Sequence, residues 1–305
     1  MARRLMLWRD ATKMDRRHAL SGLPRVRGED RLLLKLLLLF LLVLQTSVPA
    51  CQRQEKMPGI FPDPGLDAAV RKAIGKPEGE LVPQDCAPLT TLLALWSDIS
   101  NLSGIQQCAN LTQLELGHNK ISDISGLSSL TKLTQLGLSD NRIVDISPVA
   151  SLANLTRLDI GYNRISNVRP LSQLGNLTSL GVQSSRIADL SPLSSLSRLT
   201  SLQLDNNNLT DISLLSSLTN LTALYLGSNR ITDISALSGL TKLGTLRLVA
   251  NRIRDISPLI ENTGLGAGDS IWLEFNRLDL SPGSNAMQGI ETLKTRGASV
   301  YYAPQ

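Results

Sequence analysis

The chain has 305 residues, enough for one large core or two smaller ones, and a formal net charge of +5. Residues 1–51 contain ten bases and four acids, which leaves 21 bases and 22 acids in the rest. After residue 51 the chain therefore lacks the net positive field that attracts a nucleic acid, and we expect no such partner. Only 3% of the residues are aromatic, whereas leucine recurs at regular intervals, which excludes an ordinary globular core and indicates a repeat.

Residues 1–51 have the pattern of an export signal. A basic stretch precedes the apolar run Leu32–Leu44, and small residues follow it. The run has 13 residues, whereas a helix needs about 20 to cross a bilayer. We therefore expect export of the chain rather than a membrane-spanning helix.

The export signal ends in Ala50 and Cys51. A small residue before a cysteine at this place resembles the lipobox of bacterial lipoproteins, although Pro49 departs from the residue usual there. The resemblance implies lipid attachment at Cys51 and a membrane-anchored protein at the cell surface. The alternatives are secretion after cleavage behind Ala50 and an uncleaved anchor. Residues 52–62 are polar and are predicted to be a spacer.

A helix is predicted next, because Asp63 and Pro64 form a favoured helix start and Gly75 a favoured end. It belongs to a predicted amino-terminal cap over residues 63–88. A second helix, ending at Gly297, and a strand over residues 298–302 are predicted to cap the other end. Between the caps we expect eight repeats over residues 89–264, and residues 265–305 are assigned to an irregular last repeat with its cap.

The repeats carry the phrase Leu-x-Leu-x-x-Asn at steps of 22 residues. Serine replaces asparagine at Ser97 and Ser185, and a last copy ends at Asn276 after a step of 25. Alternating leucines predict a short strand with leucines inward, and the constant phase predicts parallel stacking around one core. The asparagine is expected to bond free backbone groups in the turn, so Ser185 predicts a weak rung. The intact asparagines are Asn119, Asn141, Asn163, Asn207, Asn229 and Asn251.

An aspartate follows each asparagine in the phrase Ile-x-Asp-Ile-Ser, with Asn167 as the exception. A column of carboxylates can bind cations, but capping of short helical turns on the convex side is the favoured interpretation. We expect no metal and no cofactor. The column consists of Asp123, Asp145, Asp189, Asp211, Asp233 and Asp255.

The phrases at 143–148 and 218–222 resemble the internalin-type repeats of bacterial surface proteins. The resemblance covers residues 63–305 and implies an α/β leucine-rich-repeat solenoid. Such a solenoid has a curved parallel sheet on its concave face, short 3-10 or irregular segments on its convex side, a helical amino-terminal cap and a helix–strand carboxy-terminal cap. The period is also similar to that of the regulatory subunit of eukaryotic protein phosphatase 1, an alternative that the export signal disfavours.

Cys86 and Cys108 are one period apart, so they occupy equivalent places in successive coils, within reach of a disulfide. The alternative is two stacked small apolar residues. A metal site is disfavoured, because no third or fourth ligand is in phase.

The resemblance implies a non-catalytic protein that binds a macromolecule through its concave face. A protein partner is expected, with a glycan as the alternative, and the protein is expected to be a monomer. A structural envelope scaffold without a single partner is the second hypothesis. An enzyme is disfavoured, because Ser139, His118 and Asp140 fall on an open strand surface without an oxyanion hole. The predicted contact residues are Glu115, His118, Arg157, Asp159, Tyr162, Gln203, Asp205, Tyr225, Arg247, Trp272 and Glu274. For Trp272, packing against the cap is an equal alternative.

Overall fold

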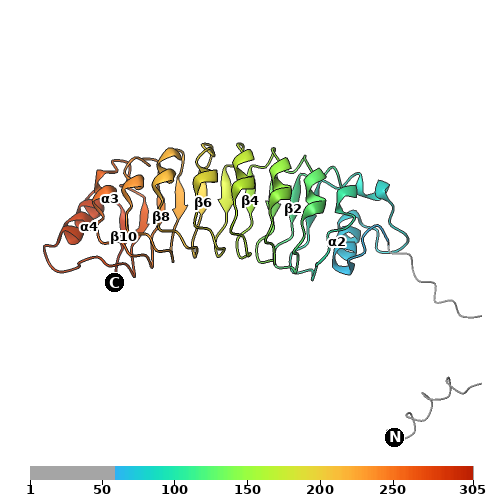
Figure 1. Cartoon of the computed structure of the whole chain (residues 1–305), viewed down its shortest axis with the longest axis horizontal. Helices are drawn as coiled ribbons and strands as arrows, with labels where there is room; N and C mark the ends of the chain where they lie inside the picture. Colours follow the sequence, from blue (N-terminus) through green and yellow to red (C-terminus); the bar gives the residue numbers. More distant parts are fainter. Residues whose placement is uncertain (1–58, 305) are drawn as a thin grey trace, which may run out of the picture. The chain divides into compact units, whose positions relative to one another are not determined.

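The computed structural model describes residues 59–304, which form an arched solenoid of stacked coils (Figure 1). The buried apolar side chains of these residues, from Phe61 to Val300, form one continuous cluster. Caps cover both ends of this cluster, so the segment contains a complete core of its own. The predicted lipid site at Cys51 and the export signal lie outside the described residues.

The strands form one parallel sheet in chain order. The central residue of each strand is buried, and its two neighbours face outward. Register holds the coils in phase, with Leu92 beside Leu114 and Leu114 beside Leu136. The predicted alternation and parallel stacking are confirmed. The strands are β1 (Thr91–Leu93), β2 (Gln113–Glu115), β3 (Gln135–Gly137), β4 (Arg157–Asp159), β5 (Ser179–Gly181), β6 (Ser201–Gln203), β7 (Ala223–Tyr225), β8 (Thr245–Arg247), β9 (Ser270–Trp272) and β10 (Ser299–Tyr301).

Short helical turns line the side opposite the sheet (Figure 1). The preceding aspartate caps them as expected: Asp123 Oδ1 accepts from the backbone N–H of Ser125 at 2.8 Å, and Asn167 does the same for Arg169 at 3.1 Å. No group of three metal-binding side chains occurs within residues 59–304. The 3-10 turns are η1 (Pro83–Cys86), η2 (Ile105–Gln107), η3 (Ser125–Ser129), η4 (Ser147–Ser151), η5 (Arg169–Gln173), η6 (Ser191–Leu193), η7 (Ser213–Ser217) and η8 (Ser235–Leu237), followed by the α-helical turn α3 (Ser257–Glu261).

The caps are the predicted helices α2 (Pro64–Ile74) and α4 (Asn285–Thr295). Helix α2 begins behind Asp63 and ends at Gly75, whose φ is +69°. Phe61, within the predicted spacer, is buried in the core, so cap packing begins before residue 63. Within residues 59–304, no helix has the length and apolar character needed to cross a membrane.

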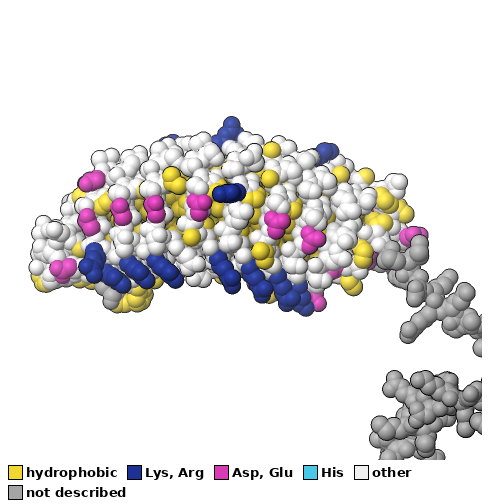
Figure 2. Space-filling view, in the orientation of Figure 1, with side chains coloured by type: hydrophobic (Ala, Val, Ile, Leu, Met, Phe, Trp, Pro, Cys, Tyr) yellow, Lys and Arg dark blue, Asp and Glu magenta, His cyan; other side chains and the backbone are white. Residues whose placement is uncertain are grey.

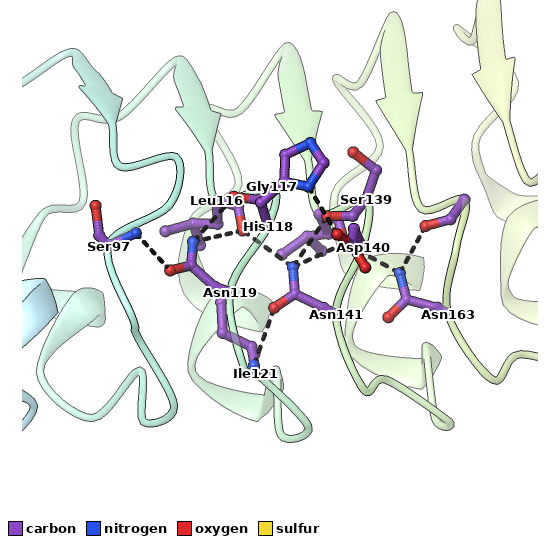
Figure 3. Close-up of polar contacts among 12 residues, drawn as sticks. Ser97, Leu116, Gly117, His118, Asn119, Ile121, Ser139, Asp140, Asn141 and Asn163 are labelled. Atoms are coloured by element: carbon purple, nitrogen blue, oxygen red, sulfur yellow. Dashed lines mark hydrogen bonds and ion pairs between the residues drawn. The ribbon is translucent and has the colours of Figure 1, made fainter.

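The asparagine ladder joins successive coils. Asn163 illustrates it: its amide donates to the carbonyls of Leu138 and Ile160, each at 3.0 Å, and its Oδ1 accepts from the N–H of Ile143 at 2.9 Å. Asn141 occupies the same place one coil earlier (Figure 3). Each asparagine thus satisfies buried backbone groups, as predicted, and the structure adds that these groups belong to two successive coils.

The rung at Ser185 is weak, as predicted. Its hydroxyl is buried without a hydrogen-bond partner in the described part of the chain. In neighbouring coils, the N–H of Ile143 and that of Ile187 bond to a ladder asparagine. The N–H of Ile165, which faces Ser185, has no such bond within residues 59–304. Serine is too short to bridge this gap.

Ser185→Asn is expected to raise the free energy of unfolding by about 1–2 kcal/mol, because it supplies the missing acceptor and donors. Urea denaturation of residues 59–305 measures the change. Ser166→Asn, at an exposed site off the ladder, is the control and should stay within about 0.5 kcal/mol. Equal stability of Ser185→Asn and the natural protein would contradict the weak-rung interpretation.

Candidate binding surface

Seven of the eleven predicted contact residues flank the buried centres of the strands and face outward. The other four, His118, Tyr162, Asp205 and Glu274, lie beyond the ends of strands only three residues long, which corrects their assignment to strand positions. The seven are Glu115 on β2, Arg157 and Asp159 on β4, Gln203 on β6, Tyr225 on β7, Arg247 on β8 and Trp272 on β9.

His118 and Tyr162 belong to a column of left-handed residues, one in each coil. Every residue directly before the ladder position has a φ between 52° and 58°. Asparagine and aspartate tolerate this conformation, whereas a bulky side chain there is unusual. The column consists of Trp96, His118, Asp140, Tyr162, Ser184, Asn206, Ser228, Ala250 and Phe275.

In the first three members of this column, His118 contacts both Trp96 and Asp140. The rings of Trp96 and His118 stack with centroids 3.8 Å apart and planes 6° apart. His118 Nδ1 lies 2.7 Å from Asp140 Oδ2 (Figure 3). The backbone N–H of His118 donates to the Ser139 carbonyl at 2.9 Å, but no hydrogen bond joins the two side chains in the described part of the chain. The cluster holds Trp96 in place while 73% of it stays exposed.

Acidic side chains on β2 and β4 lie over glycines of the next strand. Glu115 faces Gly137 across the β2–β3 pair, and a Cβ at Gly137 would collide with its carboxylate. Burial raises the pKa of Glu115, Arg157 opposes the rise and Asp159 adds to it. Asp159 faces Gly181 in the same manner. Because these glycines have no side chain, they leave room for the carboxylates of the preceding strands.

Asp205 and Arg247 form the next charged contact along the face. Asp205 Oδ1 accepts from the N–H of Gly227 at 2.8 Å and lies 3.7 Å from an amino nitrogen of Arg247. Burial raises the pKa of Asp205, although Arg247 and the Gly227 bond act in the opposite direction. Tyr225 lies beside Arg247 across the β7–β8 pair. Half of the Arg247 side chain is exposed, so it can still contact a partner.

The aromatic residues of the last two strands stack on each other. The ring centroids of Trp272 and Tyr301 are 5.4 Å apart, and the ring planes differ by 10°. Trp272 thus packs on the cap strand β10 and is half-buried, whereas Tyr301 is 48% exposed. Nearby Glu274 Oε2 is buried without a hydrogen-bond partner in the described residues. Trp272 therefore packs against the cap, which was the alternative to partner contact, but it stays partly exposed. The ring of Tyr301 is the more exposed of the two.

An exposed apolar group that the sequence did not predict lies at the opposite end of the face. Leu93 is 62% exposed and Leu95 is 49% exposed, next to Trp96. None of Leu93, Leu95, Trp96 and Tyr301 is among the eleven predicted contact residues. The repeat alignment could have identified Leu95 and Tyr301 as outward positions, because Leu95 aligns with Gly117 and Tyr301 with Trp272.

Cys86 and Cys108 are buried free thiols. Burial raises the pKa of both thiols, and each thiol also influences the pKa of the other. They therefore contact each other from successive coils, as the spacing indicated. The disulfide stays a prediction.

Comparison with known proteins places the repeats in a family. The pattern "Leucine Rich repeats (2 copies)" matches residues 131–173, 153–195, 197–239 and 219–261, and "Leucine Rich repeat" matches 107–128. Internalin C2 of Listeria monocytogenes is 36% identical, with a TM-score of 0.66 over 72% of this chain and 95% of that protein. The chain belongs to the internalin-type leucine-rich-repeat proteins. The predicted family and solenoid fold are thereby confirmed.

Two more distant structures share the fold. The functional domain of InlJ from Listeria monocytogenes, which includes a cysteine ladder, is 24% identical with a TM-score of 0.58, over 77% of this chain and 53% of that one. The plant peptide hormone receptor RGFR1, solved in complex with RGF2, is 22% identical with a TM-score of 0.53, over 65% of this chain and 33% of the receptor. No curated protein matches the chain.

Proposed function

We propose that this internalin-type chain is an exported, non-catalytic protein that binds a protein partner on its concave face. The observation that carries the proposal is the distribution of large exposed apolar side chains. Six of the nine in the described residues lie on the strands or in the turns directly after them. They are Leu93, Leu95, Trp96, Tyr162, Phe275 and Tyr301.

The face offers apolar groups at both ends and charged groups between them. Aromatic and arginine side chains supply most of the energy in protein interfaces. Tyr225, Arg247 and Trp272 fit that role, and the half-buried Glu115 and Asp205 would select a complementary partner. In the solved complex of RGFR1, a similar solenoid binds a peptide hormone. That neighbour supports the choice of a protein ligand over a glycan.

The test is a pull-down with residues 59–305 on solubilised surface proteins, followed by affinity measurement with the purified partner. Alanine at Tyr225, Arg247 and Trp272 together should weaken binding by about 100-fold or more, because hot spots contribute about 2 kcal/mol each. Alanine at Val144, Arg169 and Leu214, which are exposed away from this face, should change little. Equal affinity of the two triple variants would refute binding by the concave face and leave the scaffold hypothesis.

We also propose that a lipid on Cys51 anchors the protein at the cell surface. The export pattern of residues 1–51 and the small residue before Cys51 support this. Mass spectrometry of the mature amino terminus is the test. A peptide that starts at Cys51 without added acyl mass would refute lipidation and favour secretion.

A further inference from the structure

A row of basic side chains follows one edge of the solenoid. It is formed by the residue directly after each ladder position, which is exposed in every coil. Because strand register keeps equivalent positions in line, these side chains are spaced by one strand separation, about 4.8 Å. Figure 2 shows Lys and Arg side chains in a row along the lower edge of the molecule. We define the basic ridge as Arg142, Arg164, Arg186, Arg230, Arg252 and Arg277.

The arginines of the basic ridge have no internal partner. Among residues 59–304, none of the six makes a side-chain hydrogen bond or an ion pair. Lys120, one coil before the ridge, differs because its Nζ lies 2.5 Å from Asp98 Oδ1. Asn208 interrupts the ridge in the middle and divides it into two groups of three. The row is therefore six unpaired guanidinium groups in single file.

Nearby acidic side chains do not pair with the basic ridge, because they form hydrogen bonds with other groups. Asp140 bonds to His118, and the aspartates of the convex turns accept from backbone N–H groups, as Asp145 does from Ser147. In Figure 2 the acidic row runs separately from the basic one. Like charges at this spacing repel one another, and no contact in the described residues compensates for the repulsion. An external anion would do so.

Bases elsewhere in the repeats behave differently. Lys132, Arg198 and Lys242 precede their strands, and each donates to the amide oxygen of an asparagine one coil earlier, at 2.6–2.8 Å. These three side chains stabilise stacking and serve as charge-matched controls. The ridge arginines have no comparable structural task.

We propose that the basic ridge binds a linear anionic polysaccharide laid along the solenoid. Planar guanidinium groups bind sulfate and carboxylate through paired hydrogen bonds, and a single file of them fits a chain that carries repeated charges. A membrane would require a broad basic or apolar patch, but small side chains such as Ser166, Ala188 and Thr210 flank the ridge. Single-stranded nucleic acid would require a run of stacked aromatics, but in the six coils that carry the ridge the adjacent column has only two, Tyr162 and Phe275, which are far apart.

The test uses residues 59–305, which contain the complete core and lack the basic amino-terminal segment. Heparin is the sulfated probe and polygalacturonate the carboxylated one, both titrated at several salt concentrations. Replacing Arg142, Arg164 and Arg186 by glutamine should weaken binding about 10-fold or more and lower the slope of log affinity against log salt by about two to three. The control Lys132→Gln/Arg198→Gln/Lys242→Gln should leave both quantities nearly unchanged. Thermal unfolding checks that the ridge variant stays folded.

Binding of heparin, polygalacturonate or both with this dependence on the ridge supports the proposal and identifies the anionic group. Equal loss in the ridge and control variants would overturn it, as would no binding of either polymer at about 0.15 M salt, where exposed charges are screened beyond about 8 Å. Tighter binding of oligo(dT) or of phosphatidylglycerol vesicles would assign the ridge to nucleic acid or membrane instead. The variants leave Tyr225, Arg247 and Trp272 intact, so the outcome is independent of the proposed protein partner.

Discussion

Asn207→Ala should lower the free energy of unfolding by about 3 kcal/mol, because it removes a complete rung of the ladder. The Asn207 amide donates to the carbonyls of Val182 and Leu204 at 3.0 and 3.1 Å, and its Oδ1 accepts from the N–H of Ile187 at 3.0 Å. The side chain is only 7% exposed, so water cannot replace these bonds. A buried backbone group left without a partner costs about 1–3 kcal/mol.

The adjacent residue provides a matched control. Asn208 is exposed and makes no side-chain hydrogen bond within the described residues, so Asn208→Ala should change stability by less than about 0.5 kcal/mol. Asn207→Asp separates hydrogen bonding from packing, since it keeps the shape and the acceptor but loses both amide donors. Urea denaturation of residues 59–305 measures all three variants. Similar losses in Asn207→Ala and Asn208→Ala would show that the ladder bonds do not determine stability.

Asp63→Ala should also cost about 3 kcal/mol, because one carboxylate joins the cap to the first coil. Oδ1 accepts from the N–H groups of Gly65 and Leu66 at 2.9 and 3.0 Å. Oδ2 accepts from the N–H groups of Ser100 and Asn101 at 2.8 and 3.0 Å. Loss of a helix cap alone costs about 1 kcal/mol, and the bonds to the first coil add to it.

The contribution of Asp63 should depend on pH. Burial alone would raise its pKa, but hydrogen bonds from Ser100, Leu66 and Asn101 outweigh burial and hold the pKa below its usual 3.8. A carboxylate with a lowered folded pKa stabilises the fold above the unfolded pKa and loses that contribution as pH falls through the folded pKa. The stability difference between the natural protein and Asp63→Ala should stay constant from pH 7 to about 5 and shrink below about pH 4. A difference that grows at low pH would contradict this account.

Periodicity made most of the fold predictable. The 22-residue phase determines which leucines are buried, where the strands pair and which asparagines bond between coils, and it identified Ser185 as the weak rung. Strand length was not predictable, because the left-handed turn before each ladder residue depends on backbone geometry that the hydrophobic pattern does not encode. His118 and Tyr162 were therefore assigned to strands, although they lie in that turn.

The binding surface was less predictable than the fold. The outward positions follow from alternation, but their exposure depends on neighbours in other coils. Trp272 is outward and still packs on Tyr301, whereas Trp96 stays exposed on top of His118. The basic ridge is visible in the sequence as the residue after each ladder position. Only the contacts of the structure separate it from bases such as Lys132 that have internal partners.

At the left-handed column, the residues best for stability differ from those best for binding a partner. Trp96, Tyr162 and Phe275 hold φ values of 55°, 54° and 58°, where a bulky residue is strained by roughly 1 kcal/mol or more. Glycine or asparagine at these three places would relax the backbone and make the solenoid more resistant to unfolding, while erasing the large groups that it displays. The left-handed turn that recurs in every coil thus lowers the stability of the solenoid wherever it carries a large aromatic side chain. A more stable version of this protein is obtained most easily by discarding part of the surface proposed to recognise its partner.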